Sequence, residues 1–296
     1  MGMQINTNVS ALNAYRNLSN TQNDLSKSLE KLSSGLRINR AADDAAGLAI
    51  SEGLRSQIGG LNVAARNAQD GISVIQTAEG ALTEVHSILQ RMRDLAVQAG
   101  NDSNNEESRT AIDTEAKALS AELGRISEST NFNGIDLLKG GSLSFQVGAN
   151  GDASSQIGVT LTDLKTALTG VVTIVDSGPG VDPVDPADDV DHSATMTLDF
   201  SSATAAATSI TSLDTAITAI STSRSELGAV QNRFESTINT LNVSKENLTA
   251  AESRIRDTDM ASEMVNFTRA NLLSQAGTAM LAQANQSNSG VLQLLG

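Results

Sequence analysis

The chain of 296 residues contains no cysteine and no tryptophan, and its aromatic side chains are limited to five phenylalanines and one tyrosine. The absence of cysteine excludes disulfides, thiol catalysis and thiolate metal sites. Because aromatic side chains are so few, we expect no base-stacking surface, and aliphatic side chains and alanine must fill the core. The formal net charge of −14, with no cluster of Lys and Arg, argues against nucleic acid as a partner.

Long apolar runs are also missing. No stretch approaches the ~18 consecutive apolar residues of a membrane span, so we expect no membrane insertion. The first residues, MGMQINTN, lack the basic and apolar regions of a cleavable secretory signal. The sequence therefore predicts a chain that carries neither a membrane span nor a cleaved signal.

Groups that catalyse reactions or hold metal ions are scarce. The two histidines, His86 and His192, belong to no HExxH motif, and the chain has neither a G-x-S-x-G motif nor a phosphate-binding loop. The adjacent Asp43 and Asp44 would point about 100° apart on a helix, with no third carboxylate at i+3 or i+4. We predict no enzymatic activity, no metal and no cofactor.

Proline is confined to positions 179–186, so long helices are allowed on both sides of that stretch. Apolar residues recur with coiled-coil spacing over residues 18–36 and again over residues 54–75. The second stripe restarts at Ala78, which predicts a register shift near residues 79–80. A further helix is predicted over 106–129, and one long helix is predicted after the prolines. The latter carries seven apolar residues spaced seven apart: Leu213, Ile220, Leu227, Phe234, Leu241, Leu248 and Ile255.

Three long helices before the prolines and one after them favour an antiparallel bundle that closes on itself. Between them, NFNGIDLL (131–138) predicts a turn at Asn133–Gly134, and LSFQVGAN, VVTIV and ATMTLDF have the composition of short strands. The predicted fold class is mainly α, a long antiparallel coiled-coil helical bundle formed by the paired N- and C-terminal regions. Small β-hairpins and a short variable insertion occupy the middle.

The insertion contains DSGPGVDPVDPADDVDHS (176–193), which is acidic and rich in proline and glycine. This composition predicts an exposed loop. The spacing of its aspartates matches no calcium-loop template, so a solvated acidic loop is favoured over a calcium site. The aspartates considered as calcium ligands are Asp182, Asp185, Asp188, Asp189 and Asp191.

Two motifs place arginines directly before aspartates, one near each end of the chain. The first, RINRAADDAAG, contains Arg37, Arg40, Asp43 and Asp44. The second, ESRIRDTDMASEM, contains Arg254, Arg256, Asp257 and Asp259. Folding the chain back on itself would bring them together. Two interpretations remain open, namely pairing within one chain and a docking joint between subunits.

The two ends of the chain resemble bacterial flagellin. The resemblance rests on INTNVSALNAYRNL with LSSGLRINRAADDAAGLAISE at one end and on MVNFTRANLLSQAGTAMLAQANQSNSGVLQLL at the other, and it covers about residues 3–140 and 210–296. It implies an inner helical core domain (1–42 and 258–296), an outer helical domain with hairpins (43–170 and 201–257), and a short hairpin with the acidic loop (171–200) in place of large outer domains.

By this resemblance the chain is a structural subunit that polymerises into the extracellular flagellar filament, and RINRAADDAAG is a joint used in subunit packing. The C-terminal helix would line the channel through which subunits are exported by the flagellar type III apparatus. Expected partners are further copies of the chain, an export chaperone at the C-terminal segment, and filament cap and hook-junction proteins. The residues expected in the core-domain coiled coil are Leu18, Leu25, Leu29, Leu32, Leu36, Met264, Leu272, Leu273, Met280, Leu281, Leu292 and Leu295.

Some flagellins are also ligands of vertebrate Toll-like receptor 5. Residues 90–98 resemble the recognised patch, and Arg91, Leu95 and Glu115 match its contacts, although Met92 and Asp94 depart from the usual pattern. Two alternatives to the filament subunit stay open at this point. One is a hook-filament junction protein of the same family, and the other is a monomeric secreted coiled-coil receptor ligand.

Overall fold

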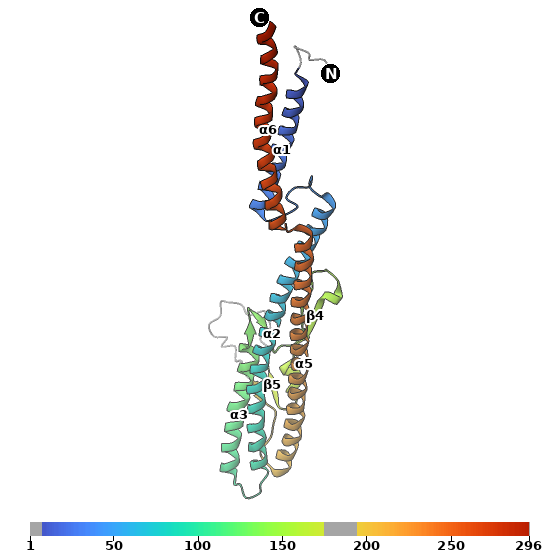
Figure 1. Ribbon diagram of the computed structural model, residues 1–296. Coiled ribbons are helices and arrows are strands. Elements are labelled where there is room, and N and C mark those ends of the chain that lie inside the picture. Colours follow the sequence, from blue (N-terminus) through green and yellow to red (C-terminus); the bar gives the residue numbers. More distant parts are fainter. Residues whose placement is uncertain (1–7, 175–193, 296) are drawn as a thin grey trace, which may run out of the picture. The chain divides into compact units, whose positions relative to one another are not determined.

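The computed structural model describes residues 8–174 and 194–295, with side chains described as far as residue 286 at the C-terminal end (Figure 1). The chain divides into two compact units, one made of residues 1–59 and 244–296 and the other of residues 60–243. We call them the terminal unit and the bundle unit. The α-helices are α1 (Val9–Ser34), α2 (Ala45–Ala99), α3 (Glu106–Ser129), α4 (Leu164–Ala167), α5 (Ala203–Arg256) and α6 (Met260–Leu295).

In the terminal unit, α1 and α6 lie side by side and antiparallel (Figure 1). Asn8 Nδ2 at the start of α1 donates a hydrogen bond of 2.9 Å to the carbonyl of Ala284 near the end of α6. The residues withdrawn from solvent on α6 are spaced alternately by four and three, which is the spacing of a coiled-coil seam. They are Glu263, Phe267, Ala270, Ser274, Gly277, Leu281 and Ala284, opposite Ala11, Ala14, Leu18, Thr21, Leu25, Ser28 and Leu32 of α1.

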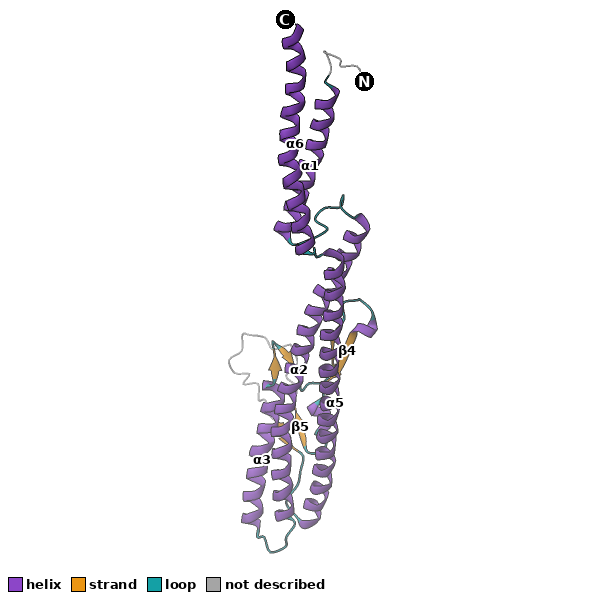
Figure 2. Ribbon diagram, viewed as in Figure 1, coloured by secondary structure: helices purple, strands orange, loops and turns teal. Residues whose placement is uncertain are grey.

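In the bundle unit, α2, α3 and α5 run alongside one another (Figure 2). Ion pairs joining Arg93 to Asp214 and Arg224 to Glu79 show that α2 and α5 are antiparallel, because the residue numbers rise on one helix as they fall on the other. The buried stripe of α2 runs unbroken in steps of four and three: Ala64, Ala68, Gly71, Ile75, Ala78, Leu82, Val85, Leu89, Met92, Ala96 and Ala99.

The predicted register shift near residues 79–80 is therefore wrong. The sequence pattern placed Ala65 and Ile72 in the stripe, whereas the structure buries Ala64 and Gly71 and leaves Ala65 and Ile72 partly exposed. Gly71 is needed there because a Cβ at that position would lie 2.8 Å from Phe234 Cζ. The Phe234 ring also makes an edge-to-face contact with Phe145, at a centroid distance of 5.7 Å.

The seven-residue repeat of α5 runs through the bundle core and continues into the terminal unit. Its first five members, from Leu213 to Leu241, are buried, and Leu248 and Ile255 are half-buried in the part of α5 that belongs to the terminal unit. The prediction of a single helix after the prolines is wrong, because α5 ends at Arg256 and α6 begins at Met260.

The described part of the bundle unit also contains three antiparallel strand pairs: β1 (Asn131–Phe132) with β2 (Ile135–Asp136), β3 (Ser142–Gln146) with β4 (Gln156–Thr160), and β5 (Val172–Ile174) with β6 (Ala194–Met196). Asn133 and Gly134 have φ values of 51° and 79°, as a tight turn between β1 and β2 requires. The fold class predicted from the sequence is confirmed. The acidic loop, with its five aspartates and His192, lies outside the described residues.

Candidate functional site

The segment between α1 and α2, residues 35–44, contains the first Arg-Asp motif. Helix α1 ends at Ser34 because Gly35 adopts a left-handed conformation (φ 74°), from which its N–H donates to the Lys31 carbonyl at 2.9 Å. The chain then leaves the helix and meets the end of α5. We call residues 35–44 together with residues 253–259 the junction; all of it belongs to the terminal unit.

Backbone groups hold the two halves of the junction together. Leu36 and Asp257 form an antiparallel bridge, the Arg37 N–H donates to the Arg256 carbonyl at 2.6 Å, and the Thr258 N–H donates to the Gly35 carbonyl at 3.0 Å. The Arg37 guanidinium also donates to the Ile255 carbonyl, from Nη2 at 2.6 Å and from Nε at 3.2 Å. Arg37 thus satisfies two carbonyls that a helix end leaves without partners, which explains why α5 can stop here.

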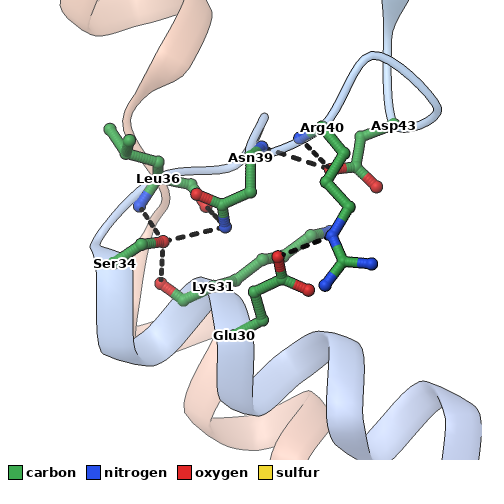
Figure 3. A network of polar contacts seen from close by, with 7 residues as sticks. All are labelled: Glu30, Lys31, Ser34, Leu36, Asn39, Arg40 and Asp43. Carbon is green, nitrogen blue, oxygen red and sulfur yellow. Dashed lines mark hydrogen bonds and ion pairs between the residues drawn. The ribbon is translucent and has the colours of Figure 1, made fainter.

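Asp43 stabilises the turn formed by residues 39–43 (Figure 3). Its Oδ2 accepts hydrogen bonds from the N–H groups of Asn39 (3.1 Å) and Arg40 (2.9 Å). These bonds to the charged form lower the pKa of the Asp43 carboxyl below its ordinary value. Arg40 in turn reaches back to α1, where its Nε lies 2.9 Å from Glu30 Oε1, and the Asn39 amide donates to Ser34 Oγ at 2.8 Å.

Asp44 and Asp259 are helix caps. Asp44 Oδ1 accepts from the Gly47 N–H at 2.8 Å at the start of α2, and Asp259 Oδ1 accepts from the Ala261 N–H at 2.9 Å at the start of α6. Gly47 has no room for a side chain, since a Cβ there would lie 2.4 Å from Asp44 Oδ2. In residues 8–174 and 194–295, no group of three or more His, Cys, Asp or Glu side chains is placed to hold a metal ion.

The remaining charged residues of the second motif differ in their surroundings. Arg256 Nη1 lies 2.7 Å from Glu52 Oε1, and only 13% of the Arg256 side chain is exposed. Asp257 Oδ2 accepts from Ser253 Oγ at 2.6 Å. Arg254 is exposed and forms no ion pair with any residue that the structure describes. The two motifs are neighbours, but they are joined by hydrogen bonds to backbone carbonyls, including those from the Arg37 guanidinium, and not by ion pairs between their arginines and aspartates.

Sequence reasoning missed Glu30 and Glu52, the carboxylates with which Arg40 and Arg256 pair. Glu30 is ten residues from Arg40, and Glu52 is 204 residues from Arg256. Neither separation matches the i+3 or i+4 spacing that identifies ion pairs within one helix. No local signal in the sequence could have found them.

The outer face of α6 carries large apolar side chains exposed to solvent. An open groove of 670 Å³ runs along it. Its lining residues are Met264, Val265, Thr268, Arg269, Leu272, Leu273 and Ala276. On α1, Val9, Leu12 and Tyr15 are similarly exposed, to 56%, 53% and 64%. The α1–α6 pair therefore leaves a substantial apolar surface without a partner within the single chain.

Some residues predicted to lie in the coiled coil are found on this exposed face and not in the α1–α6 seam. Leu18, Leu25, Leu32 and Leu281 lie in the α1–α6 seam, and Leu36 is half-buried in the junction. Small seam residues of α6 let the helices approach closely; a Cβ at Gly277, for example, would lie 3.1 Å from Leu18 Cδ1. Several large residues of α6 therefore lie outside the seam and are exposed. The side chains of Leu292 and Leu295 lie outside the described residues. The predicted members found outside the seam are Leu29, Met264, Leu272, Leu273 and Met280.

On the bundle unit, the residues of the receptor-like patch are divided. Arg91 on α2 and Glu115 on α3 form an ion pair of 2.6 Å on the surface. Leu95 is only 2% exposed and packs in the core of the single chain, so it does not lie on the surface beside Arg91 and Glu115. His86 lies one turn before Gln90 on α2 and forms a hydrogen bond of 2.9 Å with its side chain.

Comparisons with known proteins give a consistent family. Residues 5–142 match the bacterial flagellin N-terminal helical region, and residues 210–295 match the C-terminal helical region. The chain is 50% identical to a flagellin of Halalkalibacterium halodurans over 99% of this chain and 100% of that protein. It is 49% identical to a flagellin of Bacillus subtilis over 99% and 100%.

A relative from Treponema phagedenis, a flagellar filament 33 kDa core protein, is 46% identical over 99% of this chain and 100% of that protein. A crystal structure of Bacillus cereus flagellin is similar to 63% of this chain and 94% of that chain, with 31% identity and a TM-score of 0.47. Among the described residues, no helix combines the length and the apolar character needed to cross a bilayer.

Proposed function

This chain belongs to the bacterial flagellin family, and from that premise we propose a role for each surface of the terminal unit. The protein is a non-enzymatic structural subunit of the flagellar filament, the extracellular polymer of swimming motility. Copies of the chain assemble with one another in that filament. We propose below which residues contact other copies, line the export channel and bind other proteins.

We propose that copies pack through the outer faces of α1 and α6. The observation that supports this proposal is the exposure of large side chains such as Leu272 (62%), Leu273 (53%) and Met280 (63%), which lie outside the α1–α6 seam. Covering the exposed part of one such side chain stabilises an interface by roughly 1–2 kcal/mol. Repeated contacts of this kind between different faces do not close on themselves and so generate a filament.

In the same proposal the C-terminal part of α6 lines the export channel. Residues 270–295 contain no charged residue but include several amides, among them Asn271 and Gln275. A neutral polar wall would bind a passing unfolded chain only weakly. Before export, a chaperone would cover the apolar groove of α6, because an exposed surface of this kind promotes premature association.

We further propose that the junction keeps α1 and α6 in one register so that both outer faces are presented together. Its backbone bridge, the Arg37 contacts and the Asp43 turn all lie within the terminal unit. The exposed Arg254 is available for packing against another copy. For the assembled subunit we retain the proposed domains 1–42 with 258–296, 43–170 with 201–257, and 171–200.

Filament cap and hook-junction proteins are proposed to meet the same terminal surfaces at the two ends of the filament. Recognition by Toll-like receptor 5 is proposed on Arg91 and Glu115, whose side chains are 55% and 45% exposed in their ion pair. The buried Leu95 takes no direct part in this proposal. Substitution of Arg91 by alanine would lower receptor activation by the monomer without changing its helicity.

The deciding experiment is seeded polymerisation of the purified chain followed by electron microscopy. We compare the full chain, a chain lacking residues 270–296, and the double substitution Leu272→Gln and Leu273→Gln. Asn271→Gln is the matched control, because this residue is exposed on the same helix. We expect long filaments from the full chain and the control, and none from the other two. Normal elongation without residues 270–296 would overturn the proposal.

A further inference from the structure

Charged residues are unevenly distributed along the α1–α6 pair. The part formed by residues 9–23 and 270–295 contains a single charged residue, Arg16. All other charged residues of the two helices lie nearer the junction: Asp24, Lys27, Glu30, Lys31, Glu263 and Arg269. Arg16 is thus an isolated charge in an otherwise neutral part of the pair.

Arg16 lies within the exposed apolar face of α1. Leu12 precedes it by one helical turn and Val9 by two, and both are more than half exposed. Arg16 is itself exposed and has no ion pair within 4.0 Å among the residues that the structure describes. Residues 1–7 and 287–296 contain no acidic side chain, so they offer no carboxylate side chain as a partner either.

This placement matters once other copies cover the face. Any surface that buries Leu12 and Val9 also removes water from the guanidinium of Arg16. A buried charge without a counter-charge is strongly unfavourable, whereas an arginine that meets a carboxylate gains two parallel hydrogen bonds. If assembly covers this face, a carboxylate from another copy would be the most favourable partner for the Arg16 guanidinium.

Helices α1 and α6 contain three acidic residues, Asp24, Glu30 and Glu263, and the surroundings of each can be described. Glu30 is already paired with Arg40 at 2.9 Å. Asp24 and Glu263 line one cleft of 340 Å³ together with Lys27, Lys31 and Arg269. Within the described part of the chain, none of these five side chains has an ion-pair partner within 4.0 Å. Asp24 and Glu263 therefore have no direct ion-pair partner, and an incoming cation would compete there with Lys27, Lys31 and Arg269.

We propose that Arg16 of one copy binds the Asp24 and Glu263 carboxylates in the cleft of a neighbouring copy. This inference rests on the proposed packing of copies through the terminal unit. Asp24 follows Arg16 by eight residues, which corresponds to ~12 Å along a helix, so two parallel copies displaced by that amount would bring the two groups level. The pair would fix the stagger between copies, which apolar contacts alone leave free.

Charge exchange tests this contact. We compare the critical concentration for seeded growth of the full chain with that of Arg16→Glu, of Arg16→Glu with Asp24→Lys, and of Arg16→Glu with Glu263→Lys. Arg233→Glu is the matched control, since it makes the same exchange at an exposed residue of α5. Helicity of every variant is checked by circular dichroism, and growth is measured at low and high salt.

We expect Arg16→Glu to raise the critical concentration about tenfold at low salt and less at high salt, because added ions screen the new repulsion. At least one of the two double variants should return to within about threefold of the full chain. Growth of Arg16→Glu equal to that of the full chain, or failure of both double variants to restore growth, overturns the contact. Failure of the unsubstituted chain to elongate would instead overturn the proposed packing itself.

Discussion

The bundle unit and the terminal unit use the same spacing of three and four residues to opposite effect. In the bundle, the inner positions of α2 include Ile75, Leu82 and Leu89, all fully buried. In the α1–α6 pair, the inner positions of α6 include Ala270, Ser274 and Gly277, while Leu272 and Leu273 face solvent. The bundle thus buries its large apolar stripe within one chain, whereas the terminal pair leaves several large apolar side chains exposed, and these are the ones proposed to contact other copies.

This difference separates folding from assembly. A side chain already buried in the monomer contributes to the free energy of unfolding of the monomer, whereas one that is exposed there contributes only when a second copy covers it. Two leucines in two helices of one chain should therefore respond differently to the same substitution. The following predictions test that separation, beginning with the largest expected effect.

Leu82→Ala and Leu272→Ala form the most direct comparison. We expect Leu82→Ala to lower the free energy of unfolding of the monomer by about 2–5 kcal/mol, because it leaves a cavity in the core. Leu272→Ala should change it by less than about 0.5 kcal/mol and should raise the critical concentration for filament growth. Urea unfolding of the monomer and seeded growth measure the two quantities. Equal losses of monomer stability would contradict the separation.

Gly71→Ala and Gly80→Ala compare two glycines of α2. A Cβ at Gly71 would lie 2.8 Å from Phe234 Cζ, whereas a Cβ at Gly80 would have no heavy atom within 4 Å. We expect Gly71→Ala to destabilise the monomer by about 1–3 kcal/mol through overpacking. Gly80→Ala should stabilise it by up to about 1 kcal/mol, because alanine favours the helix. Thermal unfolding measures the stability of both variants. If both substitutions changed the stability in the same direction, the Phe234 contact would not be what limits the size of residue 71.

The ion pair between Arg91 and Glu115 should contribute little to the bundle. Both side chains are about half exposed, so water screens their attraction. A double-mutant cycle of Arg91→Ala and Glu115→Ala should give a coupling of about 0.2–1 kcal/mol, decreasing with added salt. A coupling several times larger, or one that salt leaves unchanged, would indicate that the pair is more strongly shielded than the monomer implies.

Asp43→Asn should have the smallest global effect and a clear local one. Because the pKa of Asp43 is lowered in the folded chain, its carboxylate stabilises the turn at neutral pH. That contribution is lost as the pH falls below the ordinary carboxyl pKa of about 4 and through the lowered value. Hydrogen exchange at the amides of Asn39 and Arg40 should be faster in the variant at neutral pH. The two proteins should converge in strong acid; a difference that persists there would point to a cause other than charge.

The amino-acid sequence alone determined much of this protein. Periodicity predicted the helix over 106–129 with its observed bounds, and Asn133–Gly134 predicted the first hairpin turn because few residue pairs suit that backbone conformation. The scarcity of histidine, cysteine and clustered carboxylates disfavoured catalysis. The motifs at both ends indicated the flagellin family, since they occur in the two halves that the family models also match.

Only the tertiary structure decided which apolar residues face inward. Spacing identifies a stripe but does not show whether large or small residues are buried, because that depends on how closely the partner helix approaches. Gly71 is inside because the Phe234 ring occupies the space beside it, and Gly277 is inside because Leu18 lies against it. The contacts of Arg37 with the end of α5 join residues more than two hundred positions apart, and no local pattern contains that information.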